Sequence, residues 1–214
     1  RLVRDWSSDV CSSDLDHPVP TVGGNISSGQ PVMAAGGFDQ KESEEFFGSE
    51  EPYLPLATRP DVLVFQTEPL VEDLEVTGPV SVQLWISSSA VDTDFTAKLV
   101  DVYPPSEDYP EGYALNLTDG ILRVKFRNSW ERTELMVPGE VYQVEVGLLP
   151  ISNLFVKGHR IRLDISSSNF PRFDVNGNTG ENPGTSPVRI TVLNSVYHDE
   201  TRPSHILLPV IPAD

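Results

Sequence analysis

Residues 80–87 read Val-Ser-Val-Gln-Leu-Trp-Ile-Ser, and this stretch decides the fold class. Every second residue from Val80 to Ile86 is aliphatic, while serine, glutamine and tryptophan stand between them. A period of two with one apolar face is typical of an antiparallel β-strand buried on one side. The same alternation predicts further strands in 122–127, 142–148, 160–165, 188–192 and 206–210.

Turn residues separate these stretches. The chain of 214 residues contains 19 prolines and 15 glycines, and no segment has a sustained helical period. Dense Gly and Pro punctuation between short alternating runs is typical of sandwiches and jelly rolls. We therefore predict an all-β sandwich of the jelly-roll (galactose-binding-like) type. The turns fall at Thr77-Gly78-Pro79, Pro104-Pro105, Asp119-Gly120, Pro138-Gly139 and Lys157-Gly158.

The chain divides into three parts by composition. Residues 1–15 contain a near-repeat, Ser-Ser-Asp-Val and Ser-Ser-Asp-Leu, and have neither helical nor strand periodicity. They resemble translated cloning or sequencing-adapter material, and the alternative is a disordered native linker. Residues 16–60 are rich in Pro, Gly and acidic side chains, and we expect an extended loop arm. Residues 61–214 hold the predicted strands and form the sandwich core.

The charge balance excludes some partners. The formal net charge of −17 argues against nucleic acid, whose phosphates require clustered Lys and Arg, and against anionic membranes. No apolar run approaches the roughly 20 residues that span a bilayer. We expect a soluble acidic bacterial protein, either cytoplasmic or secreted. Cys11 is the single cysteine, so an internal disulfide is impossible.

We find no complete catalytic motif. A nucleophile elbow needs Gly-x-Ser-x-Gly, and the nearest fragment, at 184–188, has Val188 in place of the second glycine. A lone histidine beside a strand is more often structural than a general base. We therefore predict no catalytic residue in this chain. The histidines concerned are His17, His159, His198 and His205.

Two acidic segments deserve comparison with known ligand sites. Asp174, Asn176 and Asn178 match the start of a calcium-binding EF-hand loop, but threonines stand where that loop needs a glycine and a final carboxylate. Asx turns explain these residues without a metal, so we predict no metal and no cofactor. Asp92 and Asp94 are one residue apart and cannot form opposing walls of a cleft, which favours turn capping or a contact with another domain.

Several strings resemble the last domain of the CocE/NonD hydrolase family, the X-Pro dipeptidyl-peptidase C-terminal domain. Asp-His-Pro-Val-Pro-Thr-Val-Gly-Gly-Asn stands at 16–25 and Ile-Ser-Ser-Ser-Asn-Phe-Pro-Arg-Phe-Asp at 165–174. The most specific string, Ser-Ser-Ser-Ala-Val-Asp-Thr-Asp-Phe-Thr-Ala-Lys-Leu-Val-Asp-Val, stands at 87–102. Further family-like strings occur at 59–65, 74–80, 119–121, 138–142, 158–162 and 202–206.

The resemblance implies a larger enzyme with an α/β-hydrolase domain, a helical cap and this C-terminal jelly roll. Its Ser-His-Asp triad would lie in the α/β-hydrolase part and cleave esters, or X-Pro and other dipeptidyl peptide bonds. The resemblance also places the loop after the Gly-Gly pair near the substrate pocket. The residues expected at the pocket rim are Asn25, Ile26, Ser27 and Ser28, where a relative carries bulky apolar side chains.

We further expect this domain to pack on the missing catalytic and cap domains. An aromatic ring and a guanidinium on a proline-stiffened turn suit such a contact, although Phe170 capping the sandwich core explains the same residues. The expected contact residues are Asp92, Asp94, Asn169, Phe170 and Arg172. Homo-oligomers are compatible with the same sequence.

A carbohydrate-binding jelly roll is the alternative function. Such a module needs aromatic side chains exposed on one face, and Trp85 and Trp130 are the candidates. The fold class by itself does not choose between the two functions, because β-sandwiches host many of them.

Overall fold

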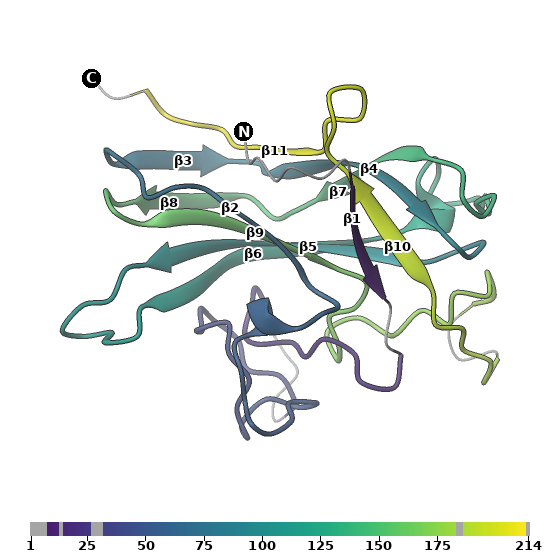
Figure 1. The fold of residues 1–214 in the computed structure, drawn as a ribbon, viewed down its shortest axis with the longest axis horizontal. Helices are drawn as coiled ribbons and strands as arrows, with labels where there is room; N and C mark the ends of the chain where they lie inside the picture. Colours follow the sequence, from purple (N-terminus) through teal and green to yellow (C-terminus); the bar gives the residue numbers. More distant parts are fainter. Residues whose placement is uncertain (1–7, 13–14, 27–31, 183–185, 213–214) are drawn as a thin grey trace.

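Two stacked β-sheets form the body of the molecule, and a long irregular segment lies against one of them (Figure 1). The computed structural model describes residues 8–12, 15–26, 32–182 and 186–212. Its elements confirm the predicted all-β sandwich. In chain order they are β1 (Ser8–Ser12), the 3-10 helix η1 (Leu56–Thr58), β2 (Leu63–Gln66), β3 (Leu74–Gly78), β4 (Ser81–Ser88), β5 (Asp94–Tyr103), β6 (Tyr113–Arg123), the 3-10 helix η2 (Val124–Phe126), β7 (Tyr142–Gly147), β8 (Ile151–Phe155), β9 (Arg160–Ser166), β10 (Leu193–Tyr197) and β11 (His205–Leu207).

Every strand pairing is antiparallel. The first sheet has the order β1-β10-β4-β11, and β7 also pairs with β4. The second sheet has the order β2-β9-β5-β6, and β3 and β8 form a separate ribbon. Strands far apart in sequence therefore become neighbours, as in a jelly roll. Within the described residues there is no helix long and apolar enough to cross a membrane.

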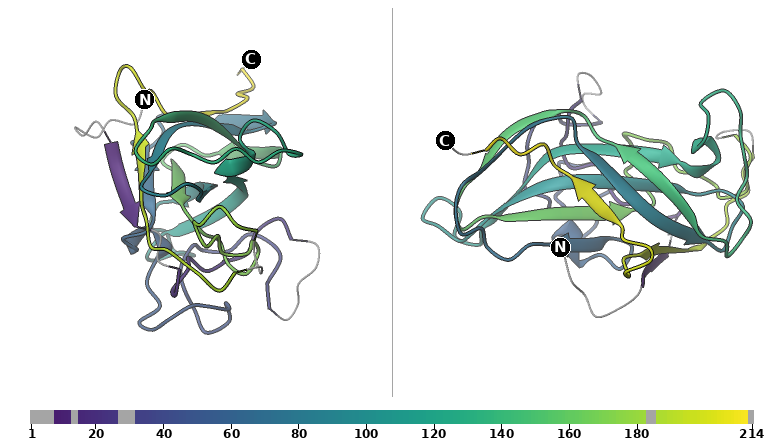
Figure 2. Two further views of the ribbon diagram at one scale, coloured as in Figure 1. Left: turned by 90° about the vertical axis from the view of Figure 1, so that its right-hand side faces the viewer. Right: turned by 90° about the horizontal axis from the view of Figure 1, so that it is seen from above.

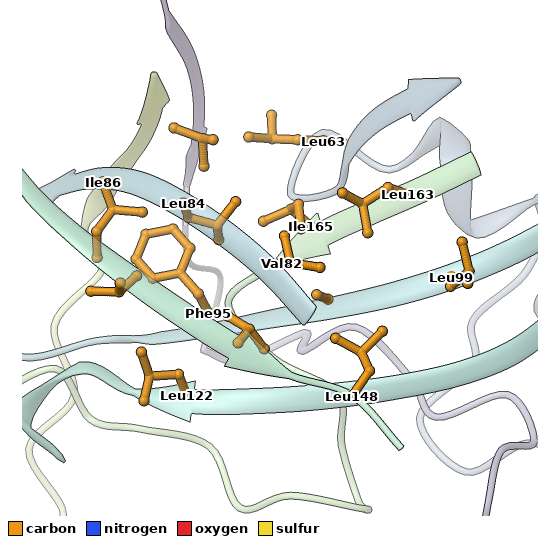
Figure 3. Close-up of a cluster of buried hydrophobic side chains, with 14 of the residues drawn as sticks. Leu63, Val82, Leu84, Ile86, Phe95, Leu99, Leu122, Leu148, Leu163 and Ile165 are labelled. Atoms are coloured by element: carbon orange, nitrogen blue, oxygen red, sulfur yellow. The ribbon is translucent and has the colours of Figure 1, made fainter. Parts of the chain in front are cut away.

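The main core lies between the two sheets. Aliphatic and aromatic side chains from both sheets point toward one another there (Figure 3). Full burial of each such side chain contributes about 1.5–3 kcal/mol, so this layer supplies most of the folding energy. The alternation expected for residues 80–87 is confirmed. Side chains with 0–2% exposure include Val82, Leu84 and Ile86 of β4 and Phe95, Leu99 and Ile165 of the second sheet.

The described parts of residues 16–60, called the arm below, cover the outer face of the second sheet (Figures 1 and 2). The arm adds a second, smaller apolar cluster to the domain. The members of that cluster are Val19, Val22, Phe46, Leu56 and Val62. The central strands β5 and β9 of the second sheet are consequently buried on both faces, between the main core on one side and the arm on the other.

Three predicted strands and one predicted turn differ from the structure. In 206–210 only Ile206 and Leu207 lie in a strand, β11, and the turn expected at Asp119-Gly120 lies inside β6. Residues 122–127 do not continue as a strand, because β6 ends at Arg123 and η2 follows. The backbone N–H of Lys125 donates to the Asp92 carboxylate at 3.1 Å, and that of Val124 donates to Thr93 O at 2.9 Å. These two bonds turn the chain. Residues 188–192 are also irregular, and β10 begins only at Leu193.

Part of the leading segment is a strand, although we expected no regular structure in residues 1–15. Ser8–Ser12 pairs with β10 from Ser8↔Tyr197 to Ser12↔Leu193. The physical reason is that the free edge of β10 offers backbone donors and acceptors that any extended segment can satisfy. Pairing of this kind needs no side-chain periodicity. The foreign origin of residues 1–15 stays a prediction.

Candidate functional site

A glycine bridge closes the base of the loop that the sequence places at a pocket rim. Gly24 N donates to Gly36 O at 2.7 Å, and Gly36 N donates back to Gly24 O at 3.0 Å. Gly24 has φ +118, and a Cβ there would lie 2.8 Å from Arg172 Nη1. Only glycine fits this backbone without strain. Asn25 is exposed and Ile26 is half-buried beyond the bridge, while Ser27 and Ser28 lie outside the described residues.

A buried lysine anchors one side of this loop base. Gln40 Nε2 donates to Val22 O and to Phe38 O, both at 3.0 Å, and so joins the two arms of the loop. Lys98 Nζ of β5 donates to Gln40 Oε1 at 2.6 Å. Burial lowers the pKa of Lys98, whereas the carboxylates of Asp119 and Asp164 favour its charged form. The sheet thus holds the loop through a buried polar contact.

A second chain of hydrogen bonds anchors the other side. Arg172 Nη1 donates to Asp119 Oδ1, and Asn169 Nδ2 donates to Asp119 Oδ2 at 2.7 Å. Thr21 Oγ1 donates to Asn169 Oδ1 at 2.9 Å. Arg172 Nη2 also approaches Asn25 O at 3.5 Å. The Asn169–Arg172 turn is therefore hydrogen-bonded to the arm at Thr21, before the glycine pair, and at Asn25, after it.

The turn also pairs with the arm through its backbone. Thr21 N donates to Phe170 O at 2.8 Å, and Phe170 N donates to Val19 O at 2.9 Å. The Phe170 ring lies 5.7 Å from the ring of Phe47, which is 53% exposed. The side-chain polar atoms of Asn169 form hydrogen bonds within this domain, whereas the rings of Phe47 and Phe170 form a partly exposed aromatic surface. The contact with a catalytic domain stays a prediction for all of these residues.

Asp92 and Asp94 form a separate buried cluster with two cations. Arg123 Nε and Nη2 each donate to the Asp94 carboxylate at 2.9 Å, and Lys125 Nζ lies 3.7 Å from Asp92 Oδ2. Asn176 Nδ2 bridges both carboxylates, at 2.7 Å from Asp94 Oδ1 and 3.2 Å from Asp92 Oδ2. Burial raises the pKa of Asp94, and the adjacent Arg123 guanidinium acts in the opposite direction.

The predicted Asx turn is present in the same cluster. Asn176 Oδ1 accepts from Asn178 N at 2.9 Å, and Asn178 has φ +61. Asn176 thereby ties the segment that follows Asp174 to the start of β5. Within the described ranges no group of three or more His, Cys, Asp or Glu side chains could hold a metal ion. The cations near Asp92 and Asp94 are the protein's own side chains.

The covered face has little free volume. An internal cavity of about 20 Å³ lies between the arm and the sheet, among residues that include Lys98, Asp119 and Asp164. This is about the space of one water molecule, so this cavity is too small for a substrate. These residues can fix the position of a loop. Their polar groups form hydrogen bonds and ion pairs with one another.

Sequence reasoning missed the residues that do this positioning: Gln40, Lys98 and Asp119. No local signal marks Lys98, because residues 94–99 alternate polar and apolar side chains as a strand with one exposed face would. All residues from 94 to 101 are nevertheless buried. Gln40 carries no signal either, since its role depends on the arm folding back onto β5.

The fold places this chain in the class of all-β sandwich domains, with a loop arm held on one sheet by buried hydrogen bonds and ion pairs. The chain belongs to the X-Pro dipeptidyl-peptidase C-terminal non-catalytic domain family, whose model matches residues 24–207. The resemblance to CocE/NonD hydrolases stated from the sequence is thereby confirmed.

Particular relatives agree with this membership. Over 209 residues the chain is 41% identical to cocaine esterase from Rhodococcus sp. (strain MB1 Bresler). The alignment covers 96% of this chain and 32% of that protein. An α-amino acid ester hydrolase structure superposes with a TM-score of 0.78 at 30% identity, covering 96% of this chain and 33% of the other. An aminopeptidase from a marine sediment Thaumarchaeota archaeon gives 0.77 at 27% identity, with 98% and 34% covered. The chain thus spans about a third of these relatives.

Proposed function

We propose that this chain is the accessory domain of a serine α/β-hydrolase that cleaves esters or X-Pro and other dipeptidyl peptide bonds. It packs on the α/β-hydrolase and cap domains, and the loop above the Gly24–Gly36 bridge contributes to the rim of their substrate pocket. Membership of the family, and relatives named esterase, ester hydrolase and aminopeptidase, support this proposal.

The observation that carries the rim role is the double anchoring of the loop base. Lys98 with Gln40 holds one side, and Asp119 with Arg172 holds the other. A side chain that shapes a pocket must be held within about 0.5 Å of its working position by supporting residues. An ordinary surface loop has no need of two buried charged groups beneath it.

In the proposed reaction the catalytic serine lies in the α/β-hydrolase domain and forms the acyl-enzyme there. This chain would supply no catalytic group and would contribute only to the walls of the substrate pocket. Asn25 and Ile26 would limit which acyl or leaving groups fit, because they stand directly beyond the fixed glycine bridge. Small side chains at Ser27 and Ser28 would leave room that bulky residues at the same positions would close.

The first experiment separates the accessory role from an independent activity. The 214-residue chain and the full-length enzyme are assayed side by side on p-nitrophenyl esters and on an X-Pro chromogenic peptide. We expect an inert chain and an active full-length enzyme that a serine-directed fluorophosphonate inactivates. Turnover by the chain alone would overturn the proposal.

The second experiment tests the rim. In the full-length enzyme, Ser27→Phe with Ser28→Phe should lower kcat/KM for bulky esters at least about tenfold while acetyl esters change little, as for a steric block of one subsite. Val71→Phe is the matched control, because Val71 is 82% exposed and lies outside the arm. An unchanged ester preference in the double variant would show that the loop lies away from the pocket.

Carbohydrate binding is the second candidate, and one observation favours it. Trp130 is 78% exposed, and its ring stacks 6.5 Å from that of Phe126. Trp85 offers less, since it is half-buried and its cross-strand neighbour Tyr197 is covered by the Arg202 guanidinium at 4.0 Å. Binding on a glycan array that Trp130→Ala abolishes would establish this function. Absence of binding would exclude it.

A further inference from the structure

The small cavity between the arm and the second sheet has a strong hydrogen-bond acceptor in its wall. Asp164 of β9 lines this cavity of about 20 Å³ and is 6% exposed. Its Oδ2 accepts from Arg162 Nη2 at 2.9 Å. Its other oxygen, Asp164 Oδ1, is buried and accepts from no donor in the part of the chain that the structure describes. Buried carboxylate oxygens without a donor are costly, so this atom calls for a partner.

The Lys98 side chain brings spare donors to the same wall. In the strand register Lys98 of β5 lies opposite Asp164 of β9 and opposite Asp119 of β6. Its ammonium group nevertheless donates to Gln40 Oε1 at 2.6 Å and forms no direct ion pair with either carboxylate among the described residues. An ammonium group has three N–H donors, so two of them remain for a group inside the cavity.

Neighbouring hydroxyl groups do not supply the missing donor. Ser166 Oγ donates its proton to Ser168 O at 2.9 Å. Thr96 Oγ1 lies 2.6 Å from Ser166 Oγ and must be the donor of that pair, because Ser166 has already used its proton. Both side chains line the cavity, yet neither has a proton left for Asp164.

The size and the charges of the cavity select its occupant. A space of about 20 Å³ holds one water molecule and excludes larger ligands. A monovalent cation would be repelled by the Lys98 ammonium group, and a halide by the carboxylates of Asp119 and Asp164. Water carries no charge and both donates and accepts, so it can satisfy Lys98 and Asp164 at the same time.

We propose that this cavity is a binding site for one ordered water molecule, which accepts from Lys98 Nζ and donates to Asp164 Oδ1. The Ser168 hydroxyl, which also lines the cavity, gives the water a third partner. The water connects Gln40 of the arm, through Lys98, to Asp164 and Arg162 of β9. The base of the loop is thereby fixed to two neighbouring strands instead of to β5 alone.

The first test is a high-resolution crystal structure of the 214-residue chain. We expect a density peak within about 3.2 Å of both Lys98 Nζ and Asp164 Oδ1. Crystals soaked in rubidium and in bromide should give no anomalous peak at this position. An anomalous peak would assign the site to an ion, and a position without any density would show a dry cavity. Either result would overturn the proposal.

The second test counts long-lived water molecules in solution by ¹⁷O magnetic relaxation dispersion. Val62 lines the cavity, so the added methylene of Val62→Ile competes with the water for space. We expect this variant to lose the dispersion amplitude of about one water molecule per chain. We also expect a lower urea midpoint, because Asp164 Oδ1 then loses its donor. Val19→Ile, on another side of the cavity, provides an independent variant with the same expected results.

Val64→Ile is the matched control. Val64 packs against the same apolar cluster as Val62 but does not line the cavity, so its variant should keep the parent amplitude. An amplitude that is unchanged in both Val62→Ile and Val19→Ile would overturn the proposal. A urea midpoint that rises in both variants would also overturn it, because an apolar group that fills a dry void stabilises a protein.

Discussion

Strands of the two sheets differ in how many of their side chains are buried. β7 of the first sheet alternates between exposed and buried residues from Gln143 to Gly147, with Val144 and Val146 inward. In β5 of the second sheet, all eight residues from Asp94 to Asp101 are buried. The arm causes the difference, because it covers a face that would otherwise meet water. A charged side chain on a covered face needs a partner of opposite charge, because burial removes its solvation. Water solvates a charged side chain on an open face.

The largest effect is expected at Lys98. Lys98→Met keeps most of the side-chain volume and removes the ammonium group between Asp119 and Asp164. Loss of one partner from a buried ionic network costs about 3–5 kcal/mol, and we expect the free energy of unfolding to fall by that amount. Urea denaturation of the 214-residue chain measures it. Gln83→Met on the open face of β4 is the control and should cost within about 0.5 kcal/mol.

Arginine on the two faces gives the next comparison. Arg172→Ala should lower the free energy of unfolding by about 2–4 kcal/mol, because it removes the guanidinium that donates to the buried Asp119 carboxylate. Arg202→Ala removes a half-exposed ion pair with Asp199 and should cost about 0–1 kcal/mol. Equal losses in the two variants would contradict the contrast between covered and open faces.

Glycines of positive φ test the fixed base of the loop. Gly24→Ala combines φ +118 with a Cβ placed 2.8 Å from Arg172 Nη1, so we expect a loss of about 1–3 kcal/mol. Gly139 has φ +83 with nothing within 4 Å, and Gly139→Ala should cost about 1 kcal/mol from backbone strain alone. Thermal melts of both variants check the order. A smaller loss at Gly24 would mean that Arg172 moves aside freely.

The smallest effect concerns pH. Burial raises the folded-state pKa of Asp101 above 3.8, although hydrogen bonds from His159 and Asn153 lower it. Between 3.8 and the raised value the folded chain binds more protons than the unfolded chain, so stability falls as pH rises through this window. The slope is at most about 1.4 kcal/mol per pH unit.

Asp101→Asn should flatten this part of the stability curve. Urea midpoints measured at intervals from acid to neutral pH give the comparison with the parent chain. The exposed Asp108 provides the matched control, and Asp108→Asn should keep the parent slope. A parent chain whose stability rises with pH across the same interval would contradict the assigned direction.

The sequence predicted the strands with one buried face well and the remaining strands less well. Alternation located β4 and β7, because one side of each faces the main core, and it also located β9, which is buried on both faces. It placed strands wrongly at 124–127, where Asp92 turns the chain, at 188–192 and at 208–210. Propensity and alternation describe local preference, and tertiary hydrogen bonds, such as that from Ile190 N to Gly177 O, replaced that preference at these places.

For the candidate site, the glycine pair and the Asn169–Arg172 turn could be singled out from the family-like strings. Their mutual contact could not, because 147 residues separate Asn25 from Arg172. The partner of Gln40 was equally hidden, since a polar residue in an irregular arm carries no periodic signal. Such pairs become visible only when the arm lies on β5.

By itself the sequence determined an all-β sandwich and membership of a hydrolase accessory-domain family, because side-chain alternation and specific strings are local properties. The tertiary structure alone decided that β5 and β9 are buried on both faces, that Lys98 and Asp119 hold the loop base, and that β1 pairs with the edge of β10. These features depend on which distant segments pack together. Burial and electrostatics act across space, and no short window of sequence contains both partners.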